Sequence, residues 1–174
     1  MNVSLNWLKD YIDINLPPAE ISEILTAIGL EVEGQEEVES IKGGLAGIVV
    51  GYVEECGKHP NADKLSLTKV DVGNGQSLQI VCGAPNAKAG MKAIFAPDGS
   101  YIPGLDITLK KTKIRGVESN GMLVSEKEMC LSDEHNGIIE LDDKFEVGTP
   151  MAKIFGLDDP IIEIALTPNR ADCA

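Results

Sequence analysis

The chain has 174 residues, 43% of them hydrophobic and 25% charged, with a formal net charge of −13 at pH 7. These values are ordinary for a globular protein and exclude wholesale disorder. The longest apolar run, Leu45–Val53, is far shorter than the roughly 20 residues of a membrane-spanning helix, and residues 1–10 lack the basic start and apolar stretch of a secretory signal.

Two short helices are predicted in the first 30 residues. Ser4 is a typical N-cap for a first helix that runs to Ile14, and Pro18 suits the first turn of a second helix that ends at Gly29. The apolar positions at helical spacing are Leu5, Leu8 and Ile12, then Ile21, Ile24, Leu25 and Ile28. A helical pair this short is marginally stable alone, so it needs another element to pack against.

A short strand and an acidic connector are expected next. Five glutamates fall between Glu31 and Ser40, and such a run is typical of a solvated linker. We therefore place a domain boundary near Ser40.

From Leu45 onward the sequence is typical of short strands separated by glycine-rich turns. Gly73-Asn74-Gly75, between two β-type runs, is a strong hairpin signal. Ser125 and Glu128 have capping-box spacing and predict a short helix over 126–131. The expected strands cover 45–55, 65–72, 77–82, 91–96, 105–109, 113–116, 121–124 and 138–141. This pattern predicts a five-stranded OB-fold barrel with additions.

The last segment is predicted to contain a helix over Met151–Phe155 and a strand over Ile161–Leu166. The simplest architecture is an α+β chain in which an OB-fold β-barrel is inserted into a small discontinuous α+β domain. The barrel is expected at 41–146, and the discontinuous domain at 1–40 and 147–174. Because the sequence stops without a natural terminus, we expect a longer protein.

The net charge conceals a basic region. Lys58–Arg115 contains nine basic and four acidic residues, so this stretch carries +5 while the rest of the chain is strongly acidic. Charge effects are screened beyond about 8 Å at physiological salt, so a local basic face can act on an acidic molecule. The alternative is a solvated strand surface without a partner.

The densest basic cluster is Lys110, Lys111, Lys113 and Arg115. Alternate side chains of a strand share one face, so the last three are expected to line one side, about 7 Å apart. This spacing is near that of phosphates in a nucleic-acid backbone, and arginine binds phosphate bidentately. Two further lysines, expected in a loop, are Lys58 and Lys64.

Aromatic residues are sparse in the predicted barrel. Between Ile41 and Cys130 they are Tyr52, Phe95 and Tyr101. Binders of single strands need aromatic platforms on which bases stack. The sequence therefore favours recognition of the backbone and shape of a folded RNA, or a purely structural module.

No constellation of residues demands catalysis or a metal. The two histidines, His59 and His135, have no identifiable partners, and Cys82 in a predicted strand is interpreted as a buried small hydrophobe. The four cysteines include no CxxC pair. Neither a structural zinc site nor a disulfide framework is supported, and a reducing cytoplasm is expected.

Several motifs resemble those of known families. Four segments resemble the tRNA-binding OB domain shared with EMAP II-like proteins: His59–Leu65, Lys69–Gly73, Ile80–Asn86 and Lys113–Met122. Five further segments resemble the beta subunits of bacterial phenylalanine–tRNA ligase: Asn6–Leu8, Gly29–Glu33, Asp133–His135, Val147–Pro150 and Thr167–Arg170. One departure is Ala171, where that family has proline before Asp-Cys.

This resemblance implies an α2β2 ligase that charges tRNA-Phe with phenylalanine, using ATP and magnesium. It further implies that aminoacylation belongs to the alpha subunit, and that the editing and anticodon-reading domains lie later in the beta chain. The present chain is therefore expected to be cytoplasmic, to lack catalytic activity, metal and cofactor, and to have tRNA-Phe and the alpha subunit, but no membrane, as partners.

The predicted function is that of a tRNA-contacting module. Its candidate RNA-binding residues are Lys64, Lys111, Lys113, Arg115, Asn120 and Ser125. For Asn120 and Ser125, a hydrogen bond to RNA and a mere capping role are both open. The alternative function is a structural or subunit-interface module without RNA contact. A free-standing tRNA-binding chaperone would leave the helical pair unexplained.

Overall fold

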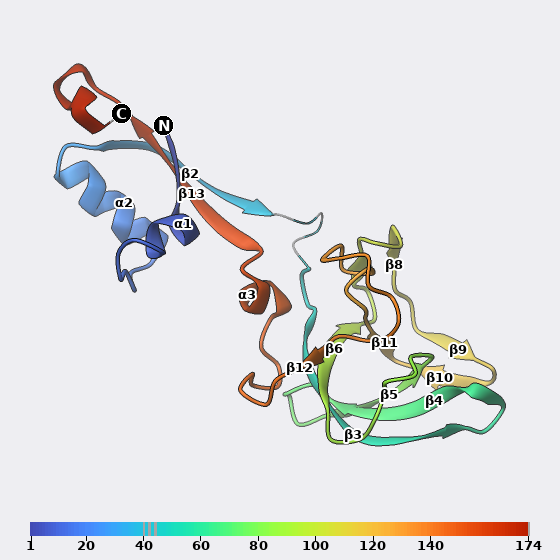
Figure 1. Cartoon of the computed structure of the whole chain (residues 1–174). Coiled ribbons are helices and arrows are strands. Elements are labelled where there is room, and N and C mark those ends of the chain that lie inside the picture. Colours follow the sequence, from blue (N-terminus) through green and yellow to red (C-terminus); the bar gives the residue numbers. More distant parts are fainter. Residues whose placement is uncertain (40, 42, 44, 174) are drawn as a thin grey trace. The chain divides into compact units, whose positions relative to one another are not determined.

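The computed structural model describes residues 1–39, 41, 43 and 45–173, and its regular structure is mostly β-strand with few helices (Figure 1). The chain divides into two compact units, Met1–Ser40 with Gly156–Ala174 and Ile41–Phe155. Each unit has its own hydrophobic core. Among the described residues, no helix is long and apolar enough to cross a membrane.

The first unit is a three-stranded antiparallel sheet with two short helices, and its sheet order is β1-β13-β2. Its elements are β1 (Asn2–Ser4), α1 (Leu5–Lys9), α2 (Pro18–Ala27), β2 (Glu31–Glu39), β13 (Asp158–Ala165) and the 3-10 helix η1 (Pro168–Cys173). The core joins Leu5 of α1 and Ile21 of α2 to Ile162 and Ile164 of β13. The sheet is thus the packing partner that the helical pair requires.

The two helices begin as predicted, but the first is shorter. The Ser4 hydroxyl accepts the backbone N–H of Trp7 at 3.0 Å, which confirms the N-cap. α1 ends at Lys9 rather than Ile14, because the next backbone N–H groups bond three residues back and close the last turn. α2 is followed by Gly29, whose φ of +92° lets the chain reverse.

The acidic run after Gly29 is a strand, so its interpretation as a linker was wrong. β2 includes these glutamates through Glu39 and pairs with β13 along its length. One face of an antiparallel sheet can be solvated, and Glu33, Glu36 and Glu37 are exposed. Acidic side chains on an outer strand therefore oppose neither pairing nor packing.

The second unit is a β-barrel built on one antiparallel sheet, in the order β11-β6-β3-β4-β5 with β12 paired to β6. Its elements are β3 (Val49–His59), β4 (Ala62–Asp71), β5 (Ser77–Cys82), β6 (Lys92–Pro97), β7 (Tyr101–Ile102), β8 (Ile107–Thr108), β9 (Thr112–Ile114), β10 (Val117–Ser119), β11 (Gly121–Leu123), β12 (Glu140–Leu141) and α3 (Met151–Phe155). The predicted Gly73–Gly75 hairpin is confirmed between β4 and β5.

The two edges of this sheet meet, which makes the barrel OB-like. The backbone N–H of Asn120 donates to the carbonyl of Gln79 at 2.9 Å. The N–H of Val81 donates to the Ser119 hydroxyl at 3.1 Å. These bonds join the junction of β10 and β11 to β5, and the enclosed core includes Val53, Val70, Ile80, Ala93 and Phe95.

Segment 147–155 belongs to the barrel unit, so the expected return to the first domain at residue 147 was too early. The Val50 N–H donates to the Thr149 carbonyl, and the N–H of Met151 donates to the Ile48 carbonyl, both at 2.9 Å. Met151 itself is fully buried. Because these contacts bind α3 to the start of β3, the unit ends at Phe155.

The helix predicted over 126–131 is a set of turns. Its capping box nevertheless forms, because the Ser125 N–H donates to the Glu128 carboxyl at 2.7 Å while the Glu128 N–H donates to the Ser125 hydroxyl at 3.4 Å. Cys130, with a φ of +56°, interrupts any helical continuation.

Candidate nucleic-acid interface

The turn between β3 and β4 holds the β9–β10 hairpin in place. His59 is 4% exposed, and its Nδ1 accepts the backbone N–H of Asn61 at 3.0 Å. A neutral imidazole that accepts at Nδ1 carries its proton on Nε2, which therefore donates to the Ile114 carbonyl at 3.1 Å. The Asn61 amide also donates to the Arg115 carbonyl at 3.1 Å. The β3–β4 turn and the β9–β10 hairpin, which are far apart in the sequence, thus lie side by side at one end of the barrel.

The basic cluster lies on this hairpin, but not as one strand. β9 covers only Thr112–Ile114, and Ile114 pairs with Val117. The two residues between them, Arg115 and Gly116, have φ values of +52° and +86°, as in the tight turns that suit β-hairpins. The expected row of Lys111, Lys113 and Arg115 on one strand face was therefore wrong, because Arg115 occupies the hairpin tip.

We call Lys111, Lys113 and Arg115, together with the turn that carries the last of them, the basic hairpin. All three side chains are exposed. Lys111 forms an ion pair with Glu118 of β10 at 2.6 Å, and Lys113 lies opposite Glu118 in the strand register. Among the described residues, Lys113 and Arg115 form no ion pair with an acidic side chain. Their charges are available to an anionic partner.

The lysines of the basic hairpin lower the pKa of the Glu118 carboxyl. The hydrogen bond from Lys111, and then the charges of Lys111 and Lys113, hold the pKa of the Glu118 carboxyl below its ordinary value of 4.5. A lowered folded-state pKa means that the ion pair stabilises the hairpin above the unfolded pKa. This contribution is lost as the pH falls through the lower, folded value.

Lys111→Ala is therefore expected to raise the pKa of Glu118 back toward 4.5. The side-chain carboxyl resonance of Glu118, followed by NMR over an acid titration, measures this shift. A titration of Glu118 that is unchanged by Lys111→Ala would show that the ion pair does not form in solution.

The remaining candidates lie in regular or buried positions. Lys58 belongs to β3 and Lys64 to β4, so their assignment to a loop was wrong, and Lys64 is exposed. The Asn120 side chain lies 3.4 Å from the Gln79 carbonyl that its backbone N–H already binds. Ser125 is 4% exposed. The last two bond within the barrel, whereas Lys64, Lys113 and Arg115 form no ion pair among the described residues. An RNA contact by any of these residues remains a prediction.

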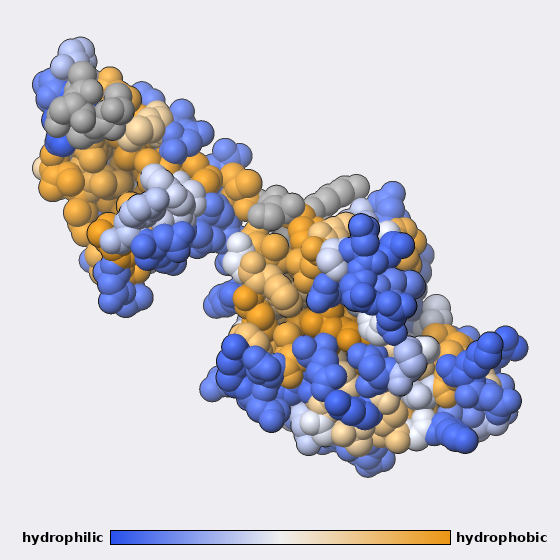
Figure 2. Space-filling view, viewed as in Figure 1, coloured by the Kyte–Doolittle hydropathy of each residue, from blue (hydrophilic) through white to orange (hydrophobic). Residues whose placement is uncertain are grey.

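Hydrophilic residues cover much of this end of the barrel unit, with hydrophobic residues between them (Figure 2). In Figure 1, the β9–β10 hairpin lies beside the far end of β4, in agreement with the bonds from His59 and Asn61. The β3–β4 turn and the connection that follows β6 both lie at this end of the barrel unit.

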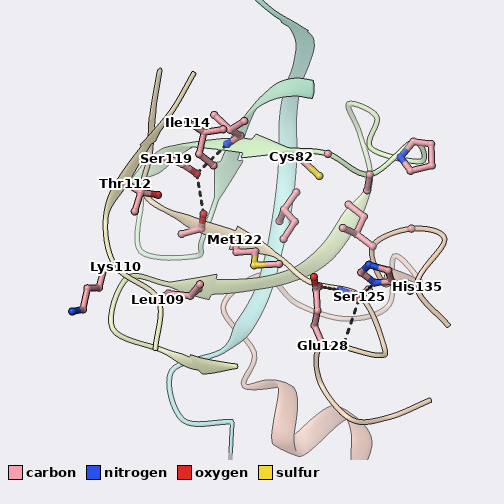
Figure 3. Close-up of a pocket in the computed structure, with 18 residues that line it drawn as sticks. Cys82, Leu109, Lys110, Thr112, Ile114, Ser119, Met122, Ser125, Glu128 and His135 are labelled. Carbon is pink, nitrogen blue, oxygen red and sulfur yellow. Dashed lines mark hydrogen bonds between the residues drawn. The ribbon is translucent and has the colours of Figure 1, made fainter. Parts of the chain in front are cut away.

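A pocket of about 430 Å³ opens beside the basic hairpin (Figure 3). Met122 lies in its middle, with Thr112 and Ile114 toward the hairpin. Ser125, Glu128 and His135 form its polar side, and the Ser125 hydroxyl is 3.2 Å from Nδ1 of His135. The sequence shows the Ser125–Glu128 spacing but not the pocket, which also needs β5 and the loop at 135–138.

The described residues contain no cluster of three or more His, Cys, Asp or Glu side chains that could hold a metal ion. Cys82 lines the pocket and is 6% exposed. Burial raises the pKa of its thiol, which makes it a poor nucleophile. Its interpretation as a buried small hydrophobe is confirmed.

Comparisons with known proteins identify the family of the barrel unit. The family model "Putative tRNA binding domain" matches residues 48–150. A phenylalanine–tRNA ligase beta subunit of Brucella abortus (strain 2308) is 51% identical over 173 residues, which are 99% of this chain and 21% of that protein. The corresponding protein of Rhodopseudomonas palustris is 50% identical over 175 residues, with 100% and 21% covered.

Among solved structures, a MetRS related protein from Pyrococcus horikoshii superposes with a TM-score of 0.43 and 30% identity, over 59% of this chain and 85% of that one. The chain spans about a fifth of the length of the curated relatives it matches. Because the family model covers more than half of its residues, the chain belongs to the putative tRNA-binding domain family, and it is about 50% identical over nearly its full length to the N-terminal region of phenylalanine–tRNA ligase beta subunits.

Proposed function

We propose that the barrel unit binds tRNA through the basic hairpin and the adjoining face of β4. The observation that carries this proposal is the bonding of the hairpin to the β3–β4 turn by His59 and Asn61. These hydrogen bonds hold the basic hairpin beside β4, which carries the exposed Lys64, at the position of the loops that OB-folds use for nucleic acids. The family match adds the class of ligand.

The charges on this face suit a phosphate backbone. Arg115 at the hairpin tip has a fork of donors that matches a phosphate group, and Lys113 supplies a second cation. The net charge of −13 does not preclude this contact, because charges farther away than about 8 Å are largely screened at physiological salt.

We further propose that the chain acts as part of a phenylalanine–tRNA ligase beta subunit, in an α2β2 assembly that takes ATP and magnesium elsewhere. Its relatives carry that subunit name and are about five times as long. In this proposal the barrel interrupts a discontinuous α+β domain, the chain itself catalyses nothing, and its role is to position tRNA-Phe.

The double variant Lys113→Ala/Arg115→Ala tests the contact face. Two charge-assisted contacts are removed, so the affinity for tRNA-Phe is expected to fall by about tenfold at low salt. Fluorescence anisotropy of labelled tRNA measures it. The matched control is Lys88→Ala/Lys144→Ala, which removes the same charge from exposed ion pairs outside β4 and the basic hairpin.

Equal losses in both double variants would show that the effect is one of net charge and would overturn the proposed face. Absence of tRNA binding at low salt by the wild-type chain would favour the alternative, a structural or subunit-interface module, which the acidic composition supports.

A further inference from the structure

The pocket beside the basic hairpin is lined by a largely buried carboxylate with one oxygen unbonded. Glu128 is 8% exposed. Its Oε2 accepts the Ser125 N–H at 2.7 Å, while its Oε1 has no hydrogen-bond donor among the residues that the structure describes. No fully enclosed side-chain oxygen of the described residues lacks a partner, so Oε1 is open to the pocket. A carboxylate oxygen accepts hydrogen bonds, so Oε1 can receive them from a ligand in the pocket that donates them.

The rest of the pocket is lined mainly by apolar residues. Its volume of about 430 Å³ lies in the range typical of small-molecule sites. Leu109, Met122 and Ile114 supply apolar walls, together with Pro85 from the segment that follows β5. Lys110, which directly precedes the basic hairpin in the chain, also lines the pocket, and its amine points away from Met122 (Figure 3).

We propose that this pocket takes one unpaired guanine base of the bound RNA, an inference that rests on the proposed function. Proteins that read folded RNA select unstacked bases by hydrogen bonds to their Watson–Crick edges. A carboxylate only accepts hydrogen bonds. Guanine presents adjacent N–H donors at N1 and N2, whereas adenine and uracil each place an acceptor beside their donor on that edge. The phosphate flanking the base would then face Lys110 and the basic hairpin.

Kethoxal footprinting of tRNA-Phe tests the inference, because this reagent modifies N1 and N2 of unpaired guanines. We expect a guanine that reacts in free tRNA to become protected in the wild-type complex. Glu128→Gln is expected to abolish this protection and to lower the affinity about tenfold. Glutamine keeps the capping bond to Ser125 but turns a donor toward the base. Glu140→Gln, an exposed change of equal charge on the same unit, is expected to leave the protection intact.

A readout without variants accompanies this experiment. Guanosine monophosphate is expected to compete with tRNA for the chain better than adenosine monophosphate. If Glu128→Gln does not fold, this comparison alone tests the guanine pocket. If the chain binds tRNA in a salt-dependent way, three results would overturn the guanine pocket and leave the proposed function intact. These results are the absence of a protected guanine, protection that survives in folded Glu128→Gln, and equal competition by both nucleotides. Absence of tRNA binding altogether would overturn the proposed function itself.

Discussion

Gly121→Ala is expected to lower the free energy of unfolding of the barrel by at least about 3 kcal/mol. Gly121 begins β11 with a φ of +132°, a conformation that other residues rarely adopt. An added Cβ would lie 2.5 Å from the Ala96 carbonyl oxygen and 2.6 Å from the Phe95 ring. Neither neighbour can move freely, because Ala96 is paired backbone in β6 and Phe95 is 2% exposed.

Urea unfolding monitored by circular dichroism measures this loss. Gly57→Ala is the matched control, since an added Cβ at this position would meet nothing within 4 Å and its φ is not in the left-handed region. It is expected to stay within about 0.5 kcal/mol of the wild type. A Gly121→Ala protein as stable as Gly57→Ala would contradict the described pairing of β11 with β6.

His59→Ala is expected to free the basic hairpin from the β3–β4 turn. The substitution leaves the Asn61 N–H and the Ile114 carbonyl without their ring partner, at a cost of about 2 to 3 kcal/mol. Hydrogen exchange of the β9 and β10 amides is expected to accelerate more than that of β3 and β6. Because the hairpin is then less well positioned, the affinity for tRNA is expected to fall as well.

His135→Ala provides the control for His59→Ala. His135 is exposed and contacts Ser125 at the other side of the pocket, so the exchange of the hairpin amides is expected to be unchanged. If His59→Ala exchanged like His135→Ala at β9 and β10, the histidine would not hold the hairpin.

Local signals in the sequence predicted the parts of the fold that depend on neighbouring residues. The Ser4 cap, the glycine-flanked hairpin at 73–75 and the Ser125–Glu128 capping box all formed. Each needs only residues within a few positions of one another. The same locality explains the errors: the acidic run at 31–39 became a strand because β13, from the far end of the chain, pairs with it.

The candidate site was predicted in composition but not in geometry. The cluster of basic residues is visible in the sequence, yet the turn at Arg115-Gly116 requires two positive φ values, and arginine gives no sign of them. The sequence shows no partner for His59, because that partner, the carbonyl of Ile114, is a backbone group 55 positions away. No side-chain pattern encodes such a contact.

The most direct test of the central claim is the salt dependence of tRNA-Phe binding by the wild-type chain. With about three phosphate contacts, from Lys64, Lys113 and Arg115, log K is expected to fall with log salt concentration with a slope of roughly −2 to −3. Anisotropy titrations between about 50 and 200 mM salt measure this slope. A slope near zero, or no binding at the lowest salt concentration, would contradict the claim that the basic hairpin and β4 hold tRNA by its backbone.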